Sequence, residues 1–324
     1  MYLLNYLKKT NMKKKFFPTI RITLTVLFLT IGVRALYYSC TDGFSLKRVQ
    51  EQILFPGNFS LPPPSAQQLH SLQKATKQPF SYLGKGSQAY AFISKDRRYV
   101  LKLFKCHHMH RAPSWLQALP LPQALSNYRD SLVARRDHRV SLALNSYTIA
   151  ATTLRNECAL IYAQILPSQK FSLPITIRDG IGREYVIDLA AHGFALQRRA
   201  DLVQPSFEKW IAQNDMESAR KAIDSLVGVI ALRSKKEVQD SDPDLHKNAG
   251  LIGTTAIFID IGGFHKNPKI PSHNEMKRDM DKVFGKFGRW LSSRSTELHA
   301  YLQQRLEAPW KSTWTSQSKH TNAP

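Results

Sequence analysis

The spacing of apolar residues changes character along the chain. Between residues 80 and 104, three short runs alternate apolar and polar positions, separated by a glycine-containing loop and a polar turn. Two more such runs, 172–177 and 184–189, flank an Asp-Gly-Ile-Gly turn. Helical spacing then predicts helices over 206–213, 218–236 and 274–306. Strands followed mainly by helices predict an α+β fold.

Residues 126–166 contain neither Gly nor Pro, and we expect them to be mostly helical. The second half of this segment has one acid, Glu157, in an otherwise apolar run. If Glu157 faces inward it needs a cation, because burying an unpaired charge is costly. On an exposed face it would instead pair with Arg155 or with water, and both arrangements stay open.

The most informative stretch is a polar loop followed by a predicted hairpin. Residues 242–248 combine acids, Pro, His, Lys and Asn, which is typical of a loop. Apolar runs at 249–252 and 256–259 flank a Gly-Thr-Thr turn and predict two antiparallel strands. Asp260 directly follows the second strand, so the hairpin brings it beside the polar loop. Carboxylate and amide oxygens of this kind are suited to Mg²⁺.

These residues resemble the catalytic core of the protein-kinase-like superfamily. Asp260-Ile261-Gly262 matches its D-x-G motif, and Asp244-Leu245-His246-Lys247-Asn248 is similar to the D-L-H-x-x-N loop of small-molecule phosphotransferases. The family pattern places the Asn five residues after the Asp, whereas Asn248 follows Asp244 by four and Asp242 by six. The resemblance implies that Asn248 and Asp260 bind Mg²⁺ and that Asp244, preferred over Asp242, orients the acceptor hydroxyl.

The first strands carry a second part of this resemblance. Gly84, Gly86 and Ala89 form a G-x-G-x-x-A loop, and Lys102 shares one face of its strand with Val100 and Phe104. The kinase glycine-rich loop and its phosphate-binding Lys have this order, although Ala89 replaces the third Gly. The resemblance implies that ATP phosphates are held by Lys102 and by the backbone of Gly84, Gly86, Ser87 and Ala89. It also implies that Glu157 orients Lys102 through an ion pair. A meander with a surface lysine is the alternative.

The resemblance further implies a two-lobed fold. Residues 79–195 would form an N-lobe with a five-stranded antiparallel sheet, and 196–310 a mainly helical C-lobe. Residues 190–195 are small and irregular, as in the hinge where adenine docks. No A-P-E-like segment follows residue 264, and residues 311–324 are expected to form a disordered tail.

A different composition precedes the body. Residues 1–40 contain a basic cluster and then an apolar run, 22–33, which extends to Tyr38 if Arg34 reaches the interface. We expect a single-pass membrane anchor, or a signal peptide whose cleavage would leave the body exported or secreted. The lysines predict the N-terminus inside and the body outside. A Pro-containing linker, 41–78, follows.

Charge and cysteine content add little to this interpretation. The formal net charge of +22 suits an anionic partner such as nucleotide, phospholipid or nucleic acid, but a solvated basic surface explains it too. No groove-reading motif accompanies the charge, so nucleic acid is not expected. Cys40, Cys106 and Cys158 form no disulfide framework. The cluster of Cys and His at 106–110 is expected to be a solvated turn rather than a metal site.

Two functional hypotheses follow. The first is ATP- and Mg²⁺-dependent phosphoryl transfer to a protein or small-molecule acceptor. The second is a membrane-tethered pseudokinase that binds a nucleotide or a protein partner without turnover, which the shortened loop and the outward topology favour. A basic membrane-surface or nucleic-acid binder is supported by charge alone. The sequence leaves open whether the protein is an enzyme.

Overall fold

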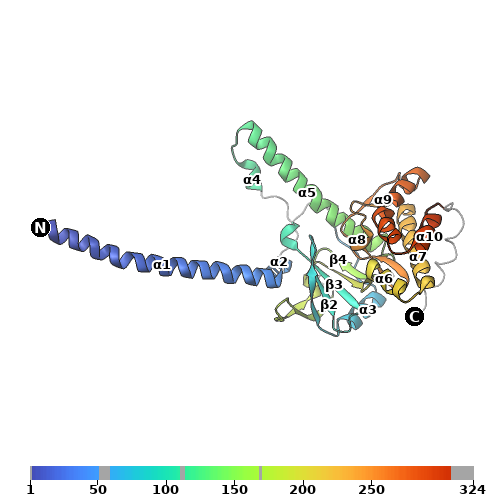
Figure 1. Cartoon of the computed structure of the whole chain (residues 1–324), viewed down its shortest axis with the longest axis horizontal. Helices are drawn as coiled ribbons and strands as arrows, with labels where there is room; N and C mark the ends of the chain where they lie inside the picture. Colours follow the sequence, from blue (N-terminus) through green and yellow to red (C-terminus); the bar gives the residue numbers. More distant parts are fainter. Residues whose placement is uncertain (1, 51–58, 110–113, 168–169, 308–324) are drawn as a thin grey trace.

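The protein is a two-lobed α+β structure, with a sheet lobe followed by a mainly helical lobe, as the sequence predicts. The computed structural model describes residues 2–50, 59–109, 114–167 and 170–307. A long N-terminal helix, α1 (Tyr2–Thr41), projects from a body in which a curved sheet adjoins a group of helices (Figure 1). The expected tail, 311–324, lies outside the described residues.

The N-lobe sheet has seven strands in the order β4-β7-β3-β2-β1-β5-β6. Neighbouring strands are antiparallel except β1 and β5, which are parallel. The strands are β1 (Phe80–Lys85), β2 (Ala89–Ser94), β3 (Tyr99–Phe104), β4 (Leu160–Gln164), β5 (Pro174–Arg178), β6 (Glu184–Asp188) and β7 (Phe194–Arg198). The expectation of five strands is therefore wrong: β4 and β7 form in segments interpreted as helix and hinge.

The predicted helix over 126–166 ends earlier than the composition indicates. Helix α5 spans Gln123–Thr152, and turns over 153–159 lead directly into β4. The reversal is made at Ala159, whose φ of 45° cannot continue a right-handed helix. The amide of Leu160 closes it by donating to the carbonyl of Arg155 at 2.9 Å. A β-branched and aromatic run, Leu160–Gln164, then joins the sheet beside β7.

The C-lobe is mainly helical. Its elements are β8 (Asp201–Leu202), α6 (Val203–Ala212), α7 (Met216–Lys235), β9 (Val238–Asp240), α8 (Leu245–Asn248), β10 (Ala249–Ile252), β11 (Thr255–Phe258), β12 (Phe264–Lys266), α9 (His273–Ser292) and α10 (Thr296–Glu307). The predicted hairpin is β10–β11, paired from Ala249 with Phe258 to Ile252 with Thr255. The predicted helix over 274–306 is two helices with a break at 293–295.

The end of α1 is docked on the N-lobe sheet. Phe44 is 1% exposed, and three aromatic rings meet it edge-on at centroid distances of 5.2, 5.3 and 5.9 Å: Tyr90, Phe92 and Tyr185. Asp42 forms an ion pair with Lys85 at 2.9 Å. Part of the predicted linker is helical, as α2 (Leu46–Gln50) and α3 (Ala66–Thr76). The chain leaving α1 is thus bound to the sheet and not a free spacer.

Within α1, residues Arg21–Thr41 form a helix long and apolar enough to cross a membrane. This segment has 21 residues, and its apolar window has a mean hydropathy of 1.5 with no residue buried against the body, whereas Thr41 at the end of the segment is buried. A membrane anchor and a signal sequence both have these properties.

A buried ion pair holds two helices of the C-lobe together. Arg233 on α7 and Asp279 on α9 form an Nη2–Oδ2 ion pair, and each side chain is 1% exposed. The guanidinium also lies 5.6 Å from the centre of the Phe258 ring, which links it to the hairpin. Removing one partner would leave a charge in the core without compensation.

We expect Asp279→Ala to lower the free energy of unfolding by about 3–5 kcal/mol, because Arg233 would stay buried and unpaired. Urea denaturation followed by circular dichroism measures this. The matched control is Glu297→Ala, which removes the exposed ion pair with Arg220 and should cost less than about 1 kcal/mol. Equal losses in the two variants would contradict the assignment.

Candidate functional site

A cleft of about 910 Å³ lies between the two lobes. It collects most of the residues singled out in the sequence: Gly86, Ser87, Ala89, Lys102, Asn248 and Asp260. Gly84, Glu157 and Asp244 are not among the residues that line it. Its volume is in the range of small-molecule and cofactor sites.

Lys102 spans the cleft from the N-lobe. It lies in the middle of β3, paired with Ala91 of β2 and Ala195 of β7. Its ammonium donates a hydrogen bond to the carbonyl of Ile259, next to Asp260 at the end of the hairpin. Burial lowers the pKa of Lys102, and the nearby Asp260 carboxylate only partly opposes this shift. Lys102 therefore connects the two lobes. The Asp260 carboxylate only partly offsets the cost of burying its ammonium.

The expected ion pair between Lys102 and Glu157 is wrong. Glu157 follows the end of α5, and its Oε1 accepts a hydrogen bond from Lys236 Nζ at 2.7 Å. The side chain is 9% exposed, so the need for a cation was predicted correctly but the partner was not. Because α5 ends at Thr152, Glu157 has no helical face from which to reach β3.

Helix α5 instead contributes two hydroxyl groups near the cleft: that of Tyr147, which lines it, and that of Ser146, which is buried and bonds the D-x-G segment. Tyr147 stacks on Phe104 with ring centres 4.2 Å apart, and its hydroxyl donates to Gln88 Oε1 at 2.8 Å. The buried Ser146 hydroxyl donates to the carbonyl of Ile261 at 2.6 Å and accepts from the amide of Phe264 at 2.7 Å. The sequence interpretation missed both residues, since uncharged side chains in an apolar helix give no chemical signal.

The glycine loop closes on the D-x-G segment through Gln88. A Cβ atom on Gly262 would lie 2.5 Å from Gln88 Oε1, so a larger residue there would require the flexible Gln88 side chain to shift. The amide of Gly86 donates to the carbonyl of Ala89 at 2.9 Å, and Lys105 Nζ donates to the carbonyl of Gly86 at 2.5 Å. These contacts hold the loop over the cleft.

The acid loop places Asp242, and not Asp244, at the cleft. The amide of Asp244 donates to the carbonyl of Asp242 at 2.9 Å, and this tight turn separates the two side chains. Asp242 lines the cleft, and its carbonyl accepts from Asn248 Nδ2. Asp244 caps α8 by accepting from the amide of His246 at 3.0 Å, and it also binds Lys286 at 3.2 Å. The preference for Asp244 in the sequence interpretation is therefore not supported by the position of its side chain.

A third acid, Asp240, holds the acid loop in place through a hydrogen bond to its backbone. It ends β9, is 5% exposed, and its Oδ1 accepts from the amide of Asp242 at 3.1 Å. Burial raises the pKa of Asp240, and the positive charge of Arg233 partly opposes this. A Cβ atom on Gly263 would collide with the same carboxylate, which explains the second glycine after the D-x-G aspartate.

The connection between the lobes lies later in the chain than the predicted hinge. Residues 190–195 belong to a 3-10 turn and the start of β7, so the boundary placed at 195/196 falls within that strand. The chain crosses after Arg198, where the amide of Arg199 donates to the carbonyl of Arg98 at 2.7 Å. Residues 197–202 line the cleft at this crossing.

No protein-family model matches the chain, and no curated protein matches it. Among solved structures, crystal structures of WbdD match, including one with the kinase inhibitor LY294002 and one described as a bifunctional kinase-methyltransferase. Identities are 15–16%, and the TM-scores are 0.30 and 0.31. The matches cover 68–69% of this chain but only 43–45% of WbdD, so this chain spans less than half the length of that protein. Similarity at this level does not indicate what this chain binds.

We expect Asp244 to be needed for stability through its cap on α8. Asp244→Ala should lower the free energy of unfolding by about 1 kcal/mol, whereas Asp244→Asn should change it little, because Asn caps as well as Asp. Urea denaturation of both variants measures the difference. An Asp244→Ala protein as stable as the wild type would show that the cap contributes nothing.

Proposed function

We propose that the chain binds ATP with Mg²⁺ in the cleft and transfers a phosphoryl group to an acceptor hydroxyl. The observation that carries this proposal is the convergence of Lys102, Asp242, Asn248 and Asp260 beneath the glycine loop. Both lobes contribute to this set, and each side chain type has a role in phosphoryl transfer.

The cleft fits an anionic ligand on its N-lobe side. Among the described residues, no carboxylate forms an ion pair with the buried ammonium of Lys102, and its lowered pKa reflects the cost of burial. A phosphate group would supply the missing negative charge through charge-assisted hydrogen bonds. Added Cβ atoms on Gly84 and Gly86 would meet nothing closer than 3.9 Å, so backbone in this loop is open to close approach.

The cleft fits Mg²⁺ on its C-lobe side. Asp260 and Asn248 line it and offer the carboxylate and amide oxygens that Mg²⁺ prefers. Among the described residues, no three His, Cys, Asp or Glu side chains form a group that would hold a metal unaided. The ion would therefore need phosphate oxygens as well, and when bound it would neutralise phosphate charge.

Asp242 is the acid that we assign to the acceptor. It lines the cleft and is steadied by Asp240 and Asn248, while Asp244 is engaged by the α8 amide and Lys286. Its carboxylate would orient the acceptor hydroxyl and receive its proton. Catalysis would then depend mainly on positioning and charge stabilisation. The acceptor is a protein or a small molecule.

A membrane-tethered pseudokinase is the second candidate, and two observations favour it. Lys102 lacks the acidic partner that kinases use to orient it, and Gln88 lies across Gly262 where phosphates would approach. Such a protein would bind nucleotide or a protein partner without transfer. In either case we propose that α1 anchors the chain with the body outside, or is cleaved as a signal sequence before export.

Nucleotide binding should depend on Lys102 and on its protonation. Lys102→Ala should weaken ATP binding by about 1–3 kcal/mol, the range for a charge-assisted hydrogen bond. Because the pKa of Lys102 is lowered, wild-type affinity should fall as the pH rises toward 10.5, before an ordinary lysine loses its charge. Lys102→Arg should keep its affinity over this range, since arginine stays protonated.

Isothermal titration calorimetry of full-length protein in detergent with ATP and Mg²⁺ measures the loss of affinity in Lys102→Ala and the pH dependence of ATP binding. Unchanged ATP affinity in a folded Lys102→Ala protein would remove the cleft from consideration as a nucleotide site. A wild-type affinity as insensitive to pH as that of Lys102→Arg would contradict the lowered pKa.

The acids of the cleft should separate transfer from binding. Asp242→Asn should abolish phosphoryl transfer while leaving ATP–Mg²⁺ binding nearly intact, because this residue contacts the acceptor. Asp260→Asn should lose the Mg²⁺-dependent part of binding, and Asp244→Asn should retain transfer. Titration with and without Mg²⁺, together with autophosphorylation and phosphate release, distinguishes these variants. If Asp244→Asn loses transfer and Asp242→Asn does not, Asp244 is the acid that orients the acceptor, as the sequence alone indicates. ATP binding without transfer in the wild type would favour the pseudokinase.

A further inference from the structure

The body carries a helical arm that does not take part in the cleft. The arm comprises residues 114–132, that is α4 (Ser114–Ala118), the turn after it, and the first part of α5. Figure 1 shows it extending from the body at an angle to α1, with the start of α5 at its outer end and α4 beside it. None of its residues lines the cleft.

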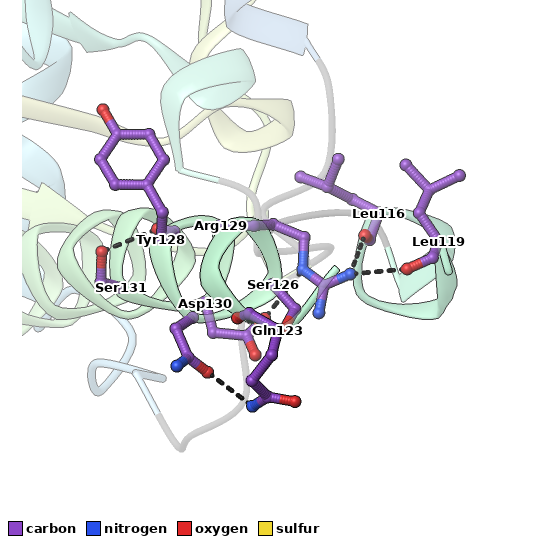
Figure 2. A network of polar contacts seen from close by, with 9 residues as sticks. Leu116, Leu119, Gln123, Ser126, Tyr128, Arg129, Asp130 and Ser131 are labelled. Atoms are coloured by element: carbon purple, nitrogen blue, oxygen red, sulfur yellow. Dashed lines mark hydrogen bonds and ion pairs between the residues drawn. The ribbon is translucent and has the colours of Figure 1, made fainter. Parts of the chain in front are cut away.

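The arm is held together by Arg129. Its Nη1 donates to the carbonyls of Leu116 at 3.3 Å and Leu119 at 2.9 Å, at the end of α4 (Figure 2). Its Nε donates to Asp130 at 2.9 Å. The guanidinium thus satisfies carbonyls that a helix end leaves free, and it fixes α4 against α5. The arm is a preformed pair of helices.

The arm exposes most of the large apolar side chains that the described body leaves in solvent. Eleven such residues are exposed outside α1, and six of them belong to the arm: Trp115, Leu119, Leu121, Leu125, Tyr128 and Leu132. Trp115 is 64% exposed and Tyr128 61%. On α5, the spacing of residues 125, 128 and 132 places them on one face of the helix. An apolar group of this size indicates a contact surface.

The position of the arm indicates which contact. Cys106, eight residues before the arm, donates through Sγ to the carbonyl of Val49 in α2 at 3.4 Å, so the chain that precedes the arm contacts the segment that follows α1. The turn between β5 and β6 also meets the end of α1, because a Cβ atom on Gly180 would collide with the carbonyl oxygen of Cys40. The next residue, Ile181, is 48% exposed. An exposed apolar residue, Ile181, therefore lies beside the point where α1 leaves the body.

We infer that the arm is a second membrane contact, lying in the interface of the bilayer that α1 enters. Trp115 and Tyr128 have the amphipathic rings that concentrate at membrane interfaces. Leu119, Leu121 and Leu125 would enter the headgroup and acyl boundary, as the apolar face of an interfacial helix does. The exposed Arg135, further along α5, would meet anionic headgroups. The inference shares with the proposed function the membrane placement of α1, but not the nucleotide site.

The test uses full-length protein reconstituted into phosphatidylcholine vesicles containing phosphatidylserine, with and without bromine atoms on the acyl chains. The readout is tryptophan emission of the wild type minus that of Trp115→Phe, which isolates Trp115. We expect brominated lipid to quench this component. The double variant Leu121→Glu with Leu125→Glu should lose the quenching. The control Leu232→Glu, at an exposed apolar position on α7, should retain it.

Carbonate extraction of the same vesicles separates the arm from the anchor. Resistant protein with unquenched Trp115 overturns the arm contact and leaves the anchor standing. Extractable protein that still floats with vesicles, and needs Leu121 and Leu125 to do so, supports the arm and removes the anchor. Protein that does not float overturns both. Unquenched Trp115 in protein that elutes as a dimer overturns the membrane contact and assigns the surface to a second copy of the chain. Quenching that persists in the Leu121→Glu, Leu125→Glu double variant overturns the role given to these two leucines in the membrane contact.

Discussion

The hydrogen bond from Lys102 on β3 to the carbonyl of Ile259, beside Asp260, is the interaction that joins the two lobes at the cleft. The half-buried Lys102 side chain donates this bond across the interface between the lobes, and burial lowers the pKa of its ammonium. A cation in such a place is stable only if opposing charge is near, and Asp260 supplies part of it. Strand β3, which lies between β7 and β2 inside the N-lobe sheet, and the hairpin β10–β11 in the C-lobe hold Lys102 and Asp260 near each other.

Much of this support could be predicted from the sequence. Strands with clear alternation, such as Tyr99–Phe104, and a hairpin with a Gly-Thr-Thr turn carry their structure in local residue types. Lys102 and Asp260 were found because charged residues between apolar neighbours are rare and have few explanations. These features can be recognised from neighbouring residues in the sequence, without knowing which elements pack against them.

The remainder depended on tertiary contacts. Leu160–Gln164 is a short apolar run that suits a helix or a strand, and only the partner strand β7 decides between them. That ambiguity moved Glu157 onto a helix and gave it the wrong partner. The choice between Asp242 and Asp244 depended on a single turn, since one backbone hydrogen bond sends the two side chains apart. Composition cannot reveal such a turn, because both acids suit a loop equally well.

The packing of Phe44 against the N-lobe sheet limits how far the body can move relative to α1. A folded domain on a flexible tether would sample a wide volume above its anchor, and the length of the tether would set the radius of that volume. Here the chain passes from the end of α1 into an aromatic pocket within three residues, and Asp42 is bound as well. With α1 in a bilayer, the mouth of the cleft would keep a nearly constant height above it. Under the proposed function, acceptors would then be selected by their distance from the membrane as well as by their chemistry.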